Sequence, residues 1–187
     1  MKSFIKIIFI PLILVSCNKS VLEKEFSCNA QSFNASTETV IDVKKTFSIE
    51  IPMHWKTNLF YDKMQSSIYS ADTTKQLSET ILIDITHLQS NYRFNDHFKK
   101  QLTINDSIQK LTSKKQHSFL FKNRDAYFTL SNGKKGSFKY QILNIFVKQN
   151  NFNSFHLKTE VYGDSAINTR FCQAIQTLNS ITFNAPQ

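Results

Sequence analysis

Apolar and polar residues alternate along much of the chain with the two-residue period of a β-strand. Residues 80–88 are a clear case, because three isoleucines there alternate with Leu82, Asp84 and Thr86. The polar members of that strand indicate a sheet face that is only partly covered. The same pattern predicts strands at residues 47–52, 57–61, 67–71, 80–88, 117–122, 126–130, 137–148, 154–162 and 180–183.

Two segments have the period of a helix instead. In residues 94–111 the apolar positions fall within about half of a helical wheel, so we expect this stripe to pack on the sheet and the polar half to face solvent. The stripe consists of Phe94, Phe98, Leu102, Ile104, Ile108 and Leu111. A second amphipathic helix is predicted at 165–178, with its N-cap within Gly163-Asp164-Ser165.

The connections between strands indicate how the sheet is built. Asn132-Gly133, within the polar stretch 131–136, predicts a tight hairpin turn, since both residues tolerate positive φ. Hairpins make a sheet largely antiparallel. The sequence therefore predicts an α+β fold, in which an antiparallel sheet of about six to eight strands is sandwiched by two long helices.

The N-terminal stretch indicates where the protein is located in the cell, not how it folds. Lys2 and Lys6 precede an apolar run that is too short to span a bilayer, and Leu14-Val15-Ser16-Cys17 ends it. This quartet resembles the lipobox of bacterial lipoproteins, which implies that Cys17 is lipidated after cleavage before it. The alternative is an ordinary secretory signal that is cut elsewhere, with Cys17 a chance residue or half of a disulfide.

These features divide the chain into three parts. We expect a signal peptide at 1–16, a lipidated N-terminus and flexible tether at 17–42, and one folded domain at 43–187. The formal net charge of +9 is compatible with an anionic membrane surface, but the lysines form no single stripe with interleaved aromatics, so nucleic acid is not an expected partner. The expected location is the bacterial cell envelope, on the periplasmic side of a membrane.

The remaining two cysteines leave a choice open. In an oxidising compartment Cys28 and Cys172 can form a disulfide, and the alternative is two unpaired thiols. Neither has the Cys-x-x-Cys spacing of a metal or redox site.

Candidate chemistry is sparse in this sequence. The five histidines show no metal-binding spacing. The two that are nearest in sequence are His87 and His97, and Asp96 lies beside the latter. Neither a metal nor a cofactor is therefore expected. There is no Gly-x-Ser-x-Gly motif, and three glycines are too few for a glycine-rich phosphate loop. The chain is therefore not expected to be an enzyme.

One cluster of residues is a candidate partner surface. It combines apolar rings with polar tips, as protein interfaces often do. Its members are His54, Trp55, Phe60, Tyr61 and Tyr69. The alternative is that these rings pack in the core and at the sheet edge.

A family resemblance supports the same architecture. The nonamer FSIEIPMHW, followed by a strand ending in Ile-Asp-Ile-Thr and then a helix, resembles the PsbP-like superfamily over residues 43–184. The shared positions are Phe47, Ile49, Ile51, Pro52 and Trp55. The resemblance implies an antiparallel sheet between helices and a mostly non-catalytic family of binding or assembly modules, with no ligand-binding position that can be carried over.

Three functions follow as hypotheses. The first is a membrane-anchored lipoprotein that binds a protein partner or a small ligand. The second is a lipid-anchored hydrolase acting on envelope material, which would need catalytic groups brought together in space. The third is a spacer module.

Overall fold

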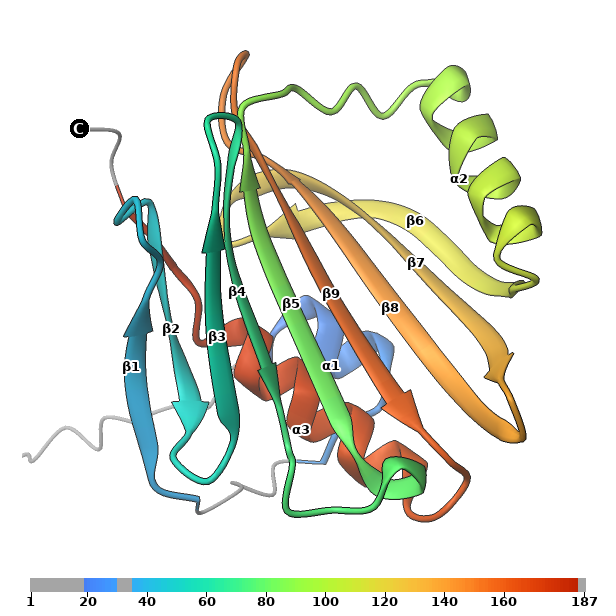
Figure 1. Cartoon of the computed structure of the whole chain (residues 1–187). Helices are drawn as coiled ribbons and strands as arrows, with labels where there is room; N and C mark the ends of the chain where they lie inside the picture. Colours follow the sequence, from blue (N-terminus) through green and yellow to red (C-terminus); the bar gives the residue numbers. More distant parts are fainter. Residues whose placement is uncertain (1–18, 30–34, 185–187) are drawn as a thin grey trace, which may run out of the picture.

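Two antiparallel sheets form the framework of the chain in a computed structural model that describes residues 19–29 and 35–184 (Figure 1). The larger sheet has seven strands in the order β3-β4-β5-β9-β8-β7-β6, and the smaller has the order β1-β2-β10. The strands are β1 Thr37–Ile41, β2 Phe47–Pro52, β3 Lys56–Tyr61, β4 Gln65–Ala71, β5 Ile81–Leu88, β6 Thr112–Phe121, β7 Arg124–Lys135, β8 Phe138–Lys148, β9 Ser154–Tyr162 and β10 Thr182–Phe183. The helices are α1 Val21–Glu25, the 3-10 turn Leu77–Glu79, α2 Asp96–Ile108 and α3 Ile167–Asn179. The α+β class and the antiparallel sheet expected from the sequence are confirmed.

One face of the large sheet, which we call the inner face, carries the core. The register places Ile83 opposite Thr159 and Ile85 opposite Leu157, and all four side chains are fully buried. Helix α3 packs on this face with Phe171, Ile175 and Leu178, while α1 lies beside it (Figure 1). The last helix was predicted to be amphipathic, and its apolar residues form its buried side.

The helix α2 differs from its prediction. None of its residues is buried, and Ile104 and Ile108 are 41% and 74% exposed. In Figure 1 the helix stands away from the opposite face of the sheet, which we call the outer face. Its N-terminal end is held by rings: Phe98 lies 5.2 Å from Phe146 and 5.8 Å from Tyr127, centroid to centroid.

The segment expected to be a tether is partly folded. Within 17–42, the helix α1 buries Leu22 completely and β1 pairs with β2. A disulfide joins Cys28 to Cys172 in α3, with 5.5 Å between the Cα atoms. The described residues of this segment therefore belong to the domain, which begins well before residue 43. Cys17 and the expected signal peptide lie outside the described residues.

The hairpin between β7 and β8 turns later than the sequence predicts. Asn132 and Gly133 lie inside β7, paired with Gln141 and Tyr140, and the chain reverses at Gly136, whose φ is 62°. Gly133 is required by a close approach, because a Cβ atom there would lie 2.5 Å from Leu111 Cδ2 and 2.8 Å from Tyr140 Cε1. The prediction of a turn at Asn132-Gly133 is wrong, because Gly133 lies inside a strand, where the close approach of its neighbours leaves no room for a side chain.

Residues 19–29 and 35–184 include no helix with the length and hydropathy needed to cross a membrane.

Candidate functional site

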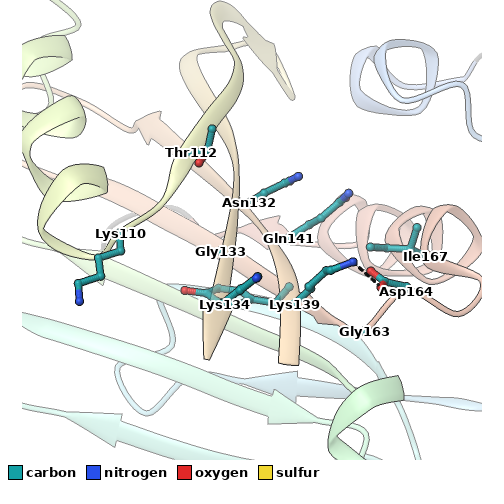
Figure 2. Close-up of a pocket in the computed structure, with 11 residues that line it drawn as sticks. Lys110, Thr112, Asn132, Gly133, Lys134, Lys139, Gln141, Gly163, Asp164 and Ile167 are labelled. Atoms are coloured by element: carbon teal, nitrogen blue, oxygen red, sulfur yellow. Dashed lines mark hydrogen bonds and ion pairs between the residues drawn. The ribbon is translucent and has the colours of Figure 1, made fainter. Parts of the chain in front are cut away.

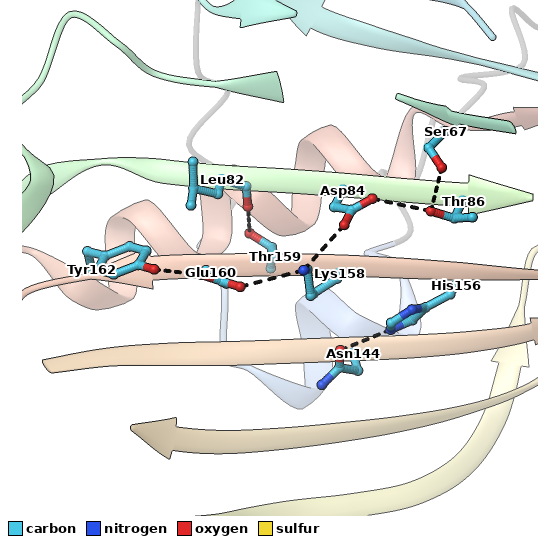
Figure 3. A network of polar contacts seen from close by, with 10 residues as sticks. All are labelled: Ser67, Leu82, Asp84, Thr86, Asn144, His156, Lys158, Thr159, Glu160 and Tyr162. Carbon is cyan, nitrogen blue, oxygen red and sulfur yellow. Dashed lines mark hydrogen bonds and ion pairs between the residues drawn. The ribbon is translucent and has the colours of Figure 1, made fainter. Parts of the chain in front are cut away.

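A row of polar side chains crosses the outer face of the large sheet (Figure 3). The register places Lys158 on β9 directly opposite Asp84 on β5 on one side and Asn144 on β8 on the other. Residues two apart in a strand share a face, so Glu160 and His156 flank Lys158 in the same row. The side chains of Asp84, Lys158 and Glu160 are 31%, 28% and 17% exposed, so this face is half-buried rather than open to solvent, and its charges need partners.

Lys158 is held between two carboxylates. Its Nζ lies 3.3 Å from Asp84 Oδ2 and 3.6 Å from Glu160 Oε1. Burial disfavours the charged amine, but the two carboxylates outweigh burial and raise the pKa of Lys158. The amine therefore stays protonated, a state in which it can donate hydrogen bonds but cannot act as a nucleophile or a base.

Tyr162 completes this end of the row. Its hydroxyl donates to Glu160 Oε2 at 2.7 Å, and burial together with that carboxylate raises the pKa of the phenol. Its ring stacks on Tyr140 with 5.2 Å between centroids. The contacts fix the orientation of the Glu160 carboxylate.

His156 is fixed in a neutral state. Its Nε2 lies 2.9 Å from Asn144 Oδ1, which can only accept, and its ring lies flat on Phe146 with 4.6 Å between centroids. Burial lowers the pKa of His156 to about 4. An imidazole paired with an amide and stacked on a ring has no carboxylate to orient it as a general base.

The helix α2 forms a roof over this row. Gln101, Asn105 and Gln109 repeat every four residues and therefore lie on one side of the helix. That side faces the sheet across a cavity of about 470 Å³. Gln101 Nε2 donates to Asn105 Oδ1 at 3.1 Å, and the Ser131 hydroxyl donates to Asp106 Oδ2 at 2.8 Å, which ties the helix to β7.

The cavity combines rings, amides and charges. Its apolar walls come mostly from Tyr92, Phe98, Leu102, Ile142 and Phe146, and its polar groups from Gln101, Asn105, Asp106, Gln109, Thr129, Asn144, His156, Lys158 and Glu160. A small-molecule site typically has this composition, with apolar walls and a few placed polar groups, and a volume of about 300–1,000 Å³. Within residues 19–29 and 35–184 no three side chains of His, Cys, Asp or Glu gather at a common point where a metal ion could bind.

The residues of the expected partner surface are divided among three environments. Trp55 is 4% exposed and belongs to the core, so including its ring in an exposed surface was wrong. His54 and Tyr61 are exposed, with His54 Nε2 3.9 Å from Asp72 Oδ2. The register puts Phe60 opposite Ser67 and therefore on the outer face with half-buried Tyr69, whereas Tyr61 points to the other side.

The sequence contained a signal for the cavity that the helical wheel concealed. In β5 and β9 polar residues alternate with fully buried ones, which marks one sheet face as wet. The helical wheel predicted that the polar half of residues 94–111, which includes Asn105, Asp106 and Gln109, faces solvent, because it lies opposite the apolar stripe. Two polar surfaces that face each other across a cavity cannot be recognised from either segment alone.

Comparison with known proteins identifies the fold. No family model matches the chain, and no curated protein matches it in sequence. The solution structure of cyanobacterial PsbP (CyanoP) from Synechocystis sp. PCC 6803 superposes with a TM-score of 0.54 at 12% identity, over 84% of this chain and 97% of that one. A crystal structure from Bacteroides thetaiotaomicron VPI-5482 has a TM-score of 0.50 at 14% identity over 79% of this chain, which spans 48% of the length of that protein. The chain shares the PsbP-like fold, and at these identities the likeness extends to the fold alone.

Proposed function

We propose that this chain is a non-catalytic binding module of the bacterial cell envelope, anchored through a lipid on Cys17, and that the cavity beneath α2 takes a small polar ligand. The observation that carries the proposal is the satisfied row of Asp84, Lys158 and Glu160 beneath a helix that leaves the space between them open. Taking charges out of water costs several kcal/mol unless each is paired. The three charges pair with one another, and the space above them is a cavity rather than packed apolar side chains, which supports binding.

The chemistry of the cavity favours binding over hydrolysis. The Lys158 amine is protonated, the His156 imidazole is neutral and paired with an amide, and the nearby hydroxyls of Ser67 and Thr86 are bonded to each other at 2.9 Å. Proton transfer needs a group poised to change its state near the working pH. These groups are held away from that condition by their neighbours.

We infer the ligand class from the charges at the cavity. Two acids, Asp106 and Glu160, line the cavity against one cation, Lys158, whose amine is also paired with Asp84, although the chain as a whole is formally +9. A neutral or positively charged ligand with several hydrogen-bonding groups suits this lining, and aromatic walls add attraction for a cation or for apolar ring faces. An anionic ligand is disfavoured.

The test uses two variants on the same helix. Asn105→Trp places a large ring in the cavity, and Lys100→Trp places the same ring on the solvent side of α2, where the lysine is exposed. A thermal-shift screen of neutral sugars, amino acids and polyamines should find a compound that raises the melting temperature of the wild type and of Lys100→Trp but not of Asn105→Trp. At a hundred times Kd a bound ligand stabilises by about 2.7 kcal/mol. A ligand that stabilises all three proteins equally binds elsewhere and contradicts the cavity assignment.

The anchor is tested separately. Labelled palmitate should be incorporated into the wild type and not into Cys17→Ser, and the unlabelled variant should leave the membrane fraction. Two acyl chains hold a protein stably on a bilayer, whereas one gives only reversible binding. Incorporation into the variant would contradict lipidation at Cys17 and leave the cavity proposal standing.

A further inference from the structure

A second cavity, of opposite charge, lies at the hairpin end of β7 and β8 (Figure 2). Its volume is also about 470 Å³. The register pairs Asn132 with Gln141 and Lys134 with Lys139, so these four side chains share the inner face of the sheet. Ile167, the first residue of α3, and Asp164 close the cavity on the side of the last helix.

The side chains at this cavity include three lysine amines, which only donate hydrogen bonds, and the amides of Asn132 and Gln141, which can donate as well as accept. Figure 2 shows the amide groups of Asn132 and Gln141 pointing in the same direction and the Lys139 amine reaching Asp164. The distance between Lys139 Nζ and Asp164 Oδ2 is 3.0 Å. The Asp164 carboxylate thus already accepts a hydrogen bond from Lys139, as an oxygen of a bound anion would.

The charges at the cavity are unbalanced. Lys110, Lys134 and Lys139 line it against one acid, Asp164. In the described ranges, no ion pair includes Lys110 or Lys134. Like charges directly opposite each other in a sheet destabilise it, so the Lys134–Lys139 pair carries an electrostatic cost that a bound anion would offset.

The loop at the rim is held in place before any ligand arrives. Gly163 donates from its backbone N–H to Lys139 O at 2.7 Å, and the Arg170 guanidinium donates to Ser165 O at 3.0 Å from Nε. Gly163 has a φ of 74°, and a Cβ atom there would lie 1.9 Å from Ser78 O. A fixed loop reduces the entropy lost on binding.

We propose that this cavity binds a phosphate monoester group. Three ammonium groups and one carboxylate leave two positive charges, which match the charge of about −1.5 to −2 that a phosphate monoester carries at pH 7. Cβ atoms of directly paired residues lie about 5 Å apart, so Lys134 and Lys139 can contact different oxygens of one phosphate. The amides of Asn132 and Gln141 then donate to the remaining oxygens.

The three glycines of the chain provide a local reporter. Gly133 and Gly163 line the cavity and Gly136 lies in the adjoining turn, and the sequence contains no other glycine. Glycine amides form a separate group of signals in a ¹⁵N–¹H correlation spectrum. Titration of the full-length protein with inorganic phosphate and with glycerol 3-phosphate, at constant ionic strength set by chloride, should shift all three signals with a saturating curve.

Three variants make the test decisive. Lys134→Gln with Lys139→Gln should weaken binding of glycerol 3-phosphate by roughly tenfold or more, because charge-assisted hydrogen bonds are lost. Lys99→Gln with Lys100→Gln removes the same charge from the solvent side of α2 and should leave the Kd unchanged. Asp164→Asn should tighten binding, because the carboxylate competes with phosphate for Lys139.

The outcomes separate the sources of the phosphate. Vesicles containing phosphatidate, compared with phosphatidylcholine vesicles, show whether a monoester on a lipid headgroup reaches the cavity as well as a soluble one. Saturable binding of either form, with the expected order of the variants, supports the site. The site is overturned if the glycine signals move with neither form, if both lysine-pair variants lose binding equally, or if Asp164→Asn binds more weakly.

Discussion

Removal of the Cys28–Cys172 disulfide should cost the domain a large part of its stability. The bridge joins residues 144 positions apart, so it closes most of the chain into one loop. The chain-entropy relation gives about 5 kcal/mol for a loop of this length, and measured losses for native bridges are about 2–5 kcal/mol. Because a domain is stable by only about 5–15 kcal/mol, the double variant Cys28→Ser with Cys172→Ser should be marginal.

Guanidinium unfolding measures this loss directly. The chain has one tryptophan, Trp55, which is 4% exposed, so its fluorescence reports the opening of the core. Reductant should move the unfolding midpoint of the wild type down to that of the double serine variant, and it should have no effect on the variant. Equal midpoints for oxidised and reduced wild type, with a fully formed bridge by intact mass, would refute the entropic argument.

Three further predictions concern single residues. Trp55→Ala should lower the free energy of unfolding by about 3–5 kcal/mol, whereas Tyr61→Ala, at an exposed position, should change it by less than about 0.5 kcal/mol; equal effects in denaturant melts contradict the burial of Trp55. His156 has a folded pKa of about 4 against about 6.5 unfolded, so the unfolded state binds the proton first and stability should fall by about 3 kcal/mol as the pH drops from 6.5 to 4. His156→Gln should remove that part of the slope, and an unchanged pH profile contradicts a neutral buried ring. Gly133→Ala should destabilise by about 1–3 kcal/mol in a thermal melt, because the new methyl group meets the Tyr140 ring, and a neutral effect would mean that the ring moves aside freely.

Much of the sheet could be predicted because its strands obey one local rule. In β9, which begins and ends at the predicted residues, every second side chain from Phe155 to Val161 is fully buried. A strand at the centre of a sheet has the same neighbours along its whole length, so the pattern in the sequence maps directly onto burial. The same reasoning succeeded for α3, which lies flat on that core.

The errors arose where the partner of a segment decides its role. The helix α2 has an apolar stripe, but rings from Tyr92, Phe94 and Phe98 hold only its first turns, and its later apolar residues are exposed. The polar side then faces a wet sheet surface. Similarly, the turn propensity of Asn132-Gly133 was overridden by the need for space beside Leu111. Neither the surface that faces α2 nor the space needed at Gly133 can be recognised from the local sequence of the segment concerned.

If Cys17 carries the proposed lipid, the folded α1 segment decides how close the domain sits to the membrane. With an acyl chain on Cys17, only two residues lead to Lys19, whose amine already bonds to Cys28 O at 2.7 Å. Two residues reach at most about 7 Å, in place of the flexible tether of 26 residues that the composition of 17–42 predicts. A connection this short would restrict the tumbling of the anchored domain, so both proposed cavities would meet their ligands within a narrow range of heights and angles above the bilayer.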